Sequence, residues 1–247
     1  MSDTNSLVPT EKNIAILGNG QSREIFERIE NFKPDITIGC NIPQEGIKLD
    51  FTACVDAFAV SRAFRANMPH YYRLERGDFK LVLGGRAREG IKGVKAEPGG
   101  KETLLEFFKR MQYIHCVIPL FEDAKTIGQR YFSSGHLAFL FACRDYPDSN
   151  IHMFGFDSFF TGSASSYTHY SIRRPNDPSP IERVSKKYTY KRPTDTVNSW
   201  QWVWKKFWDS EFNTAKSINI YGYDGDPDIS YHHEKIRCHF HEKLPAK

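Results

Sequence analysis

The sequence predicts an α/β fold, a Rossmann-like and mostly parallel sheet flanked by helices. Short apolar strands alternate with helical segments along most of the chain, and the strands lack the polar alternation of a half-exposed sheet. Strands of a parallel sheet have this continuous apolar character because helices cover both of its faces. Glycines and short polar residues also recur where the predicted strands end, and ligands of such sheets bind at those carboxyl ends.

The predicted strands are short runs of apolar residues: 14–17, 35–39, 50–55, 80–83, 113–118, 151–155 and 217–221. The predicted helices are 22–31, 57–67, 101–112, 133–146 and 194–207. The fourth of these helices contains LAFLFAC and is apolar on all sides, which indicates a buried helix. The last one begins at Thr194 as its N-cap and has one apolar face, formed by Val197, Trp200, Trp204 and Phe207.

The chain of 247 residues is long enough to bury a sizeable core as one domain, and we assign that domain to residues 13–230. Residues 1–12 are polar and predict a disordered lead-in, and 231–247 predict a polar tail. The stretch 84–100 is rich in Gly, Arg and Lys and predicts a surface loop. Residues 158–193 have little apolar periodicity and contain four prolines, which predicts a flexible insertion of the kind that forms lids.

The composition favours a folded cytoplasmic protein. The five cysteines form no CxxC pair, and most lie in apolar runs, as reduced core thiols do. The first residues do not resemble a signal peptide, and no apolar run approaches the roughly 18 residues of a membrane-spanning helix. A net charge of +4 is compatible with an anionic ligand or nucleic acid and identifies neither. The oligomeric state stays open.

A glycine turn follows the first predicted strand and leads into a helix: Gly18-Asn19-Gly20-Gln21-Ser22. Glycines let a backbone approach a phosphate closely, and the start of a helix offers free N–H groups. The turn lacks the Gly-Lys-Ser/Thr of a Walker motif and the third glycine of a dinucleotide fingerprint. Ligand binding and a plain tight turn therefore both remain open from these residues alone.

Further polar residues lie where other strands end. Asn41, Asp56 and Asp157 follow the second, third and sixth predicted strands. Ser133-Ser134-Gly135 begins a helix shortly after Arg130, an arrangement that suits ordinary N-capping or the binding of a diphosphate or carboxylate.

Two features of the second half of the chain suggest chemistry. His169, in SSYTHY of the predicted lid, is a candidate general base or a solvated surface histidine. Basic and aromatic residues interleave in KKYTYKR at 186–192, which suits a nucleic acid or another anionic acceptor; a solvated charged face is the ordinary alternative.

YDGDPD at 223–228 lacks EF-hand spacing, and the histidine-rich 232–243 lacks a recognised zinc spacing, so neither predicts a metal site.

The order of these motifs resembles the bacterial sialyltransferases of glycosyltransferase family 42. Those proteins begin with a strand and GNGPS, where this chain has GNGQS at 18–22. They end the second strand with Cys-Asn, as at Cys40 and Asn41, and have Gln-Arg before a Ser-Gly helix start, as at 129–130 and 134–135. The next strand ends Gly-x-Asp before aromatic residues, as at 155–157. The resemblance runs in order over roughly residues 13 to 170.

The resemblance implies a GT-A-like sialyltransferase variant of the fold, with a lid over a nucleotide-sugar donor and no metal cofactor. It implies a donor site that includes Asn19, Ser22, Asn41, Ser134 and Gly135, to which we add Gly18, Gly20, Asp56, Ser133 and Phe156. The chain departs from the family at three points. Its Gln-Arg pair at 129–130 lies one residue farther from the Ser-Gly pair than in the family. Asp56 replaces an Asn, and the family's base histidine corresponds to about Tyr190. Either His169 takes over that role or the reaction uses another base.

We therefore expect a metal-independent glycosyltransferase that moves a sugar from a nucleotide-sugar donor to an acceptor hydroxyl. The acceptor is either a surface glycan or a hydroxymethylated base in DNA. The expected catalytic residues are His169 as base, Tyr167 and Arg130 at the departing phosphate, and Tyr190 and Asp157. The alternatives are a nucleotide diphosphokinase, in which Asp56 and Asp157 would hold Mg²⁺, and a non-catalytic nucleotide-binding protein.

Overall fold

The structure is a computed structural model that describes residues 11–41, 47–55, 57, 60, 80–97, 99–118, 132–160, 165–168, 188–191, 194–226, 229 and 233–243. Within 165–168, 188–191 and 194–200 only the backbone is described. The predicted helix 57–67 and the predicted lead-in 1–12 lie almost entirely outside these residues. No helix among the described residues is both long enough and apolar enough to cross a bilayer.

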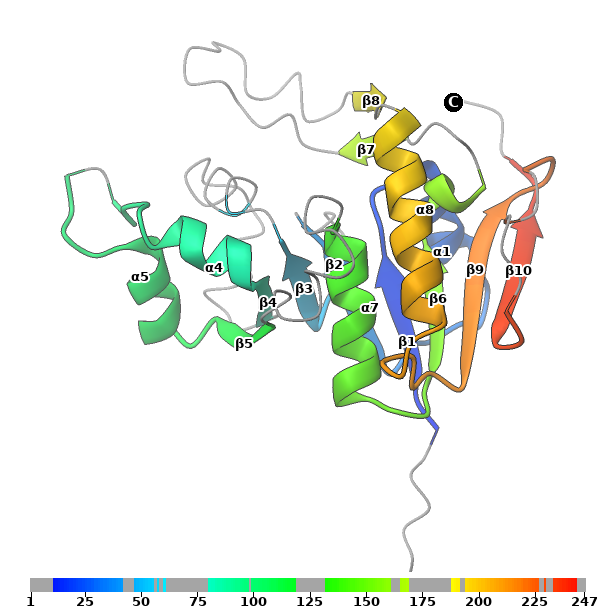
Figure 1. Ribbon diagram of the computed structural model, residues 1–247, viewed down its shortest axis with the longest axis horizontal. Coiled ribbons are helices and arrows are strands. Elements are labelled where there is room, and N and C mark those ends of the chain that lie inside the picture. The colour runs from blue at the N-terminus through cyan, green and yellow to red at the C-terminus, as the bar shows by residue number, and fades with distance from the viewer. Residues whose placement is uncertain are drawn as a thin grey trace, which may run out of the picture.

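Eight parallel strands form one sheet in the order β10-β9-β6-β1-β2-β3-β4-β5. The predicted parallel sheet flanked by helices is thereby confirmed (Figure 1). The strands are β1 (Asn13–Leu17), β2 (Ile36–Cys40), β3 (Phe51–Cys54), β4 (Lys80–Gly84), β5 (Ile114–Ile118), β6 (Asn150–Phe154), β9 (Ser217–Tyr223) and β10 (Ile236–His241).

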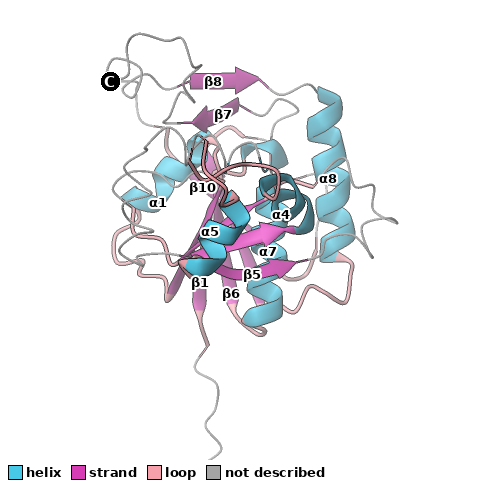
Figure 2. Ribbon diagram, turned by 90° about the vertical axis from the view of Figure 1, so that its left-hand side faces the viewer, coloured by secondary structure: helices cyan, strands magenta, loops and turns pink. Residues whose placement is uncertain are grey.

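Helices cover both faces of the sheet. One face packs against α7 (Ser134–Asp145) and α8 (Thr194–Trp208), and the opposite face packs against α1 (Glu24–Arg28), α4 (Gly85–Ile91) and α5 (Leu104–Arg110). Figure 2 shows α1 and α8 on opposite sides of the strands. Two short 3-10 helices, η1 (Gln21–Arg23) and η3 (Asp157–Phe159), follow β1 and β6. The predicted helix 22–31 is therefore shorter and begins with η1.

A second sheet of two antiparallel strands, β7 (Ser165–Thr168) and β8 (Tyr188–Lys191), lies within the predicted lid. Both views place this hairpin beyond the carboxyl ends of the main strands (Figures 1 and 2), and β7 lies next to η1. The predicted insertion thus begins within η3 and contains a hairpin beyond the carboxyl edge of the sheet. Its closure over a ligand stays a prediction.

Two segments differ from the sequence prediction. The predicted surface loop 84–100 begins as helix α4, because Ala87 and Ile91 lie one turn apart and are fully buried under the sheet. The predicted polar tail 231–247 contains the edge strand β10. Its alternate residues Ile236, Cys238 and Phe240 pack against the core, while Arg237, His239 and His241 lie on the other face and hide the pattern.

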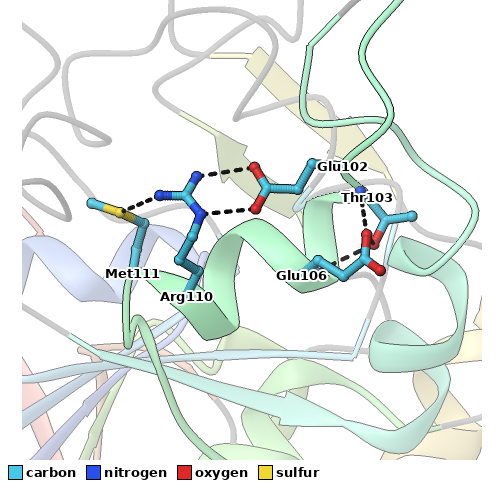
Figure 3. Close-up of polar contacts among 5 residues, drawn as sticks. All are labelled: Glu102, Thr103, Glu106, Arg110 and Met111. Carbon is cyan, nitrogen blue, oxygen red and sulfur yellow. Dashed lines mark hydrogen bonds and ion pairs between the residues drawn. The ribbon is translucent and has the colours of Figure 1, made fainter.

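Helix α5 shows a local signal that sequence reasoning did not use. Thr103 accepts the Glu106 N–H with its side chain, and Glu106 Oε2 accepts the Thr103 N–H at 2.7 Å, which forms a capping box (Figure 3). Arg110 pairs with both carboxylate oxygens of Glu102, at 2.8 and 2.9 Å. These contacts fix where α5 begins and tie its last turn to the preceding chain.

Histidines gather around Tyr221 on the sheet face that α1 partly covers. His152 Nδ1 lies 2.9 Å from the Tyr221 hydroxyl, and the rings of His239 and His241 lie against the Tyr221 ring. Burial lowers the pKa of His152 to about 4, and the nearby His239 contributes. The pKa of His239 is lowered by burial and then by His241 and Arg237.

Acid is expected to destabilise the fold through His152. The unfolded chain binds a proton there near pH 6.5, whereas the folded chain does so only near 4, so stability falls as the pH is lowered between these values. Because the imidazole is only partly buried, we expect a loss of roughly 2 kcal/mol between about pH 7 and pH 4.5. Urea unfolding at both pH values measures it. His152→Asn, which keeps an acceptor for Tyr221, should remove most of this difference; an unchanged pH dependence in this variant would contradict the assignment.

Candidate functional site

The candidate site lies where the strand order reverses. β1 pairs with β2 on one side and with β6 on the other. The chain first adds β2 to β5 on one side of β1 and then crosses to the other side to form β6. As a result Gly155, after β6, lies beside Ser22, after β1, from which it is separated by 133 residues. Ligands of open parallel sheets bind at such a switch point, outside the carboxyl ends of the strands. The segments at this point are the glycine turn (residues 18–22) after β1 and a second turn after β6, formed by Gly155, Phe156 and Asp157.

These two turns bind one another. The Gly18 N–H donates to Phe154 O at 2.7 Å, and the Gly20 N–H donates to Gly155 O at 2.8 Å. The Asp157 carboxylate accepts the N–H groups of Gln21 at 2.5 Å and Ser22 at 3.1 Å. Burial raises the pKa of Asp157, while these hydrogen bonds lower it. The N–H groups that a phosphate would use are therefore bound to a carboxylate of the protein itself.

Close packing accounts for the glycines of these turns. A Cβ at position 18 would lie 2.4 Å from the Gly155 carbonyl oxygen, and a Cβ at position 20 would lie 2.7 Å from the Asp157 carboxylate. Gly155 has a φ of +77°, in the left-handed region that favours glycine. The contact that requires glycine at positions 18 and 20 is therefore with the second turn.

Two side chains behind the glycine turn are buried. Ser22 is fully buried, and its hydroxyl accepts the Gly155 N–H at 3.1 Å, so this predicted donor-binding residue supports the turn and is not exposed to a ligand. Arg23 is 5% exposed and donates to Gly18 O at 3.4 Å and to Asn19 Oδ1 at 3.2 Å. Sequence reasoning missed Arg23, because no local pattern distinguishes a buried arginine at the start of a helix.

Asn19 and Cys40 join the glycine turn to β2. Asn19 Nδ2 donates to the Cys40 carbonyl at 3.3 Å, while its Oδ1 accepts from Arg23, so both ends of this carboxamide are held. Burial raises the pKa of the Cys40 thiol well above its ordinary value, and the nearby Arg23 opposes this shift only partly. Cys40 is therefore a neutral core thiol at physiological pH.

Asn41 and Ser134 form the part of the site that offers unused donors. The Ser134 hydroxyl donates to Asn41 Oδ1 at 2.5 Å and accepts the Val55 N–H at 3.2 Å. The Asn41 backbone has a φ of +61° and is anchored by its N–H to Ala53 O at 2.8 Å. Among the described residues no hydrogen bond involves Asn41 Nδ2, and the side chain is partly exposed. Within the described part of the chain, the two amide N–H groups of Asn41 are thus available at the end of β2.

The remaining residues at the start of α7 have structural roles. Ser133 caps the helix, accepting the His136 N–H at 3.4 Å, in a capping box with the His136 ring. A Cβ on Gly135 would lie 2.5 Å from the Phe156 ring, so Gly135 makes room for that side chain. Phe156 is 7% exposed and packs on Trp204, which places this predicted donor contact in the core.

The structure brings only part of the predicted set together. Asp56, Arg130 and His169 lie outside the described residues. Tyr167 lies on β7 and Tyr190 on β8, in adjacent register pairs of the hairpin near the glycine turn, with no side chain described. Asp157 accepts the Gln21 and Ser22 N–H groups of the glycine turn. Among the described residues, no group of three or more His, Cys, Asp or Glu side chains is placed to hold a metal ion.

The fold and the candidate site together give the class of the protein. It is an α/β protein with an eight-stranded parallel sheet, and polar groups gather at the carboxyl edge of that sheet. Comparison of the chain with protein-family models, with curated proteins and with solved structures finds no match. What the protein does must therefore be argued from the site itself.

Proposed function

We propose that the protein is a glycosyltransferase that binds a nucleotide-sugar donor at the carboxyl edge of the sheet and transfers its sugar to an acceptor hydroxyl. One observation carries the proposal. Four of the five motifs whose order resembles the family 42 sialyltransferases are joined by direct hydrogen bonds at this edge. The bonds are Asn19 to Cys40, Ser134 to Asn41, and Gln21 to Asp157. The fifth motif, residues 129–130, lies outside the described part of the chain.

The donor would contact the Asn41 side of this network. The glycine turn already has Asp157 as its acceptor, so the turn shapes the site and the Asn41 amide supplies N–H donors to phosphate or nucleotide oxygens. Ser134, which accepts from Val55, holds the carboxamide by its oxygen. Tyr167 on β7 and Tyr190 on β8 remain proposed groups at the leaving phosphate and acceptor hydroxyl, together with His169 and Arg130, which lie outside the described residues.

Thermal-shift measurements with CMP-, UDP- and GDP-sugars test the proposal. A donor that binds only the folded state, present at about 100 times its Kd, raises the free energy of unfolding by roughly 2.7 kcal/mol. Tm then rises by several degrees. Asn41→Asp keeps the acceptor for Ser134 but replaces the amide donors with negative charge, so we expect donor affinity to fall at least about tenfold.

The matched control is Asn31→Asp. Asn31 also has a positive φ, 65°, but is exposed at the opposite end of β2. This variant should keep the full donor-induced shift. The proposal fails if no nucleotide sugar raises Tm, or if Asn41→Asp responds to the donor as strongly as the unmodified protein.

The contact of Asp157 with two backbone N–H groups bears on the diphosphokinase alternative. A magnesium role for Asp157 would compete with hydrogen bonds that both of its oxygens already make. Turnover measured with and without EDTA separates the two functions: the sugar transferase keeps its activity in EDTA, and the diphosphokinase loses it.

A further inference from the structure

Strand β10 carries two histidines on one face, two residues apart. His239 and His241 share that face because successive side chains of a strand point to opposite sides, and Phe240 between them packs against the core. Both imidazole rings are partly exposed and lie against the Tyr221 ring of β9, at centroid distances of 4.9 and 5.9 Å. The two imidazoles are therefore neighbours on one side of a strand at the edge of the sheet (Figure 1).

A chain of hydrogen bonds fixes which nitrogen of the His239 ring carries the hydrogen. The Ser217 hydroxyl donates to Asn150 Oδ1 at 2.6 Å, so its oxygen accepts from Asn219 Nδ2 at 3.3 Å. The Asn219 carboxamide thereby turns its oxygen toward His239, whose Nε2 lies 2.9 Å from Asn219 Oδ1. A carboxamide oxygen only accepts, so the neutral His239 ring carries its hydrogen on Nε2 and its lone pair on Nδ1.

His239 is thus held in the way that metal-ligating histidines are held. A ligating imidazole binds the ion with its bare nitrogen and donates its other ring N–H to an oxygen, which fixes its tautomer and orientation. In the described part of the chain, no hydrogen bond involves a ring nitrogen of His241. Residues two apart in a strand have Cα atoms about 6.6 Å apart, a span that two imidazole side chains can close around one ion.

We propose that His239, through Nδ1, and His241 form a two-imidazole site for a divalent transition metal ion, with water in the remaining coordination positions. No group of three His, Cys, Asp or Glu side chains within the described ranges is placed around an ion, so the bound ion is exchangeable. Nitrogen ligands favour Cu²⁺ over Zn²⁺ and do not suit Mg²⁺, which prefers oxygen.

This metal site is separate from the candidate donor site. Three strands, β9, β6 and β1, lie between β10 and β2, the strand that ends at Asn41. The proposal does not rest on the proposed function, and it is measured without any nucleotide sugar. Asn41→Asp should bind metal normally, so a failed donor site and a failed metal site give different results.

Isothermal titration calorimetry of the full chain without a polyhistidine tag tests the proposal, with Zn²⁺, Cu²⁺ and Mg²⁺ as chloride salts. We expect one Zn²⁺ site that depends on both histidines, tighter binding of Cu²⁺, and no binding of Mg²⁺. His239→Asn and His241→Asn should each weaken Zn²⁺ binding at least about tenfold. Electron paramagnetic resonance of bound Cu²⁺ should show two imidazole nitrogens in the unmodified protein and one in His241→Asn.

Two neighbouring residues give a finer test. Asn219→Ala removes the acceptor for His239 Nε2–H and should weaken Zn²⁺ binding roughly tenfold, whereas Asn219→Asp keeps an acceptor and should bind at least as tightly as the unmodified protein. Arg237 is exposed on the same face and opposes a cation there, so Arg237→Gln should tighten binding roughly twofold at low salt.

His115→Asn is the matched control. His115 is 38% exposed and lies on β5, at the opposite edge of the sheet, so this variant should keep the affinity of the unmodified protein. Circular dichroism checks that each variant folds. The proposal is overturned if the folded protein binds neither Zn²⁺ nor Cu²⁺, if His239→Asn and His241→Asn bind as tightly as His115→Asn, or if Mg²⁺ binds as tightly as Zn²⁺.

Discussion

Gly18→Ala is expected to lower the free energy of unfolding by roughly 3 kcal/mol, because the new methyl group overlaps backbone that cannot rotate away. Its Cβ would lie 2.4 Å from the Gly155 carbonyl oxygen. Relief requires the loops after β1 and β6 to separate, which breaks the hydrogen bond from the Gly18 N–H to Phe154 O. Chemical denaturation measures the change, and we expect Tm to fall by about 8 °C.

Gly93→Ala is the matched control. No heavy atom lies within 4 Å of a Cβ built at position 93, and its φ is not in the left-handed region. The same change of residue there should leave stability within about 0.5 kcal/mol of the unmodified protein. If Gly18→Ala proves as stable as Gly93→Ala, the two turns are not packed as described. Ligand approach would then be the better reason for a glycine at position 18.

Asp157→Ala should cost about 3 kcal/mol, because two N–H groups at the start of η1 lose their acceptor. The Gln21 and Ser22 N–H groups have the carboxylate as their partner at 2.5 and 3.1 Å. Asp157→Asn should cost roughly 2 kcal/mol, since the amide oxygen can accept only one of these bonds while its NH₂ group faces the other N–H. Urea unfolding of both variants at neutral pH measures these losses.

Asp224→Ala serves as the comparison, because Asp224 is an exposed carboxylate in the turn after β9. It should change stability by less than about 0.5 kcal/mol. Native-like stability in Asp157→Asn would show that the carboxylate does not hold the glycine turn, and would return Asp157 to the catalytic role expected from the sequence.

The histidine pair His239 and His241 shows why β10 was missed. Alternation along 236–241 packs the partly buried Ile236, Cys238 and Phe240 against the core, but His239 and His241 on the opposite face are themselves half-buried against Tyr221. A strand with one apolar face and one histidine-rich, half-buried face lacks the alternation of hydrophobic and solvated residues by which a strand is predicted from sequence. Only the pairing with β9 distinguishes it from a polar tail.

The sequence by itself determined the class of the fold and predicted the edge of the sheet where the candidate site lies. Apolar runs, glycines and caps are local signals, and they located seven of the eight strands of the sheet and the polar residues that end them. Only the tertiary structure decided what those polar residues face. Asp157 lies 136 residues from Gln21, and β6 brings them together by returning beside β1. No local spacing encodes that neighbour, so the sequence alone left open whether the glycine turn binds a ligand or is a plain tight turn, and it did not predict the contact with Asp157.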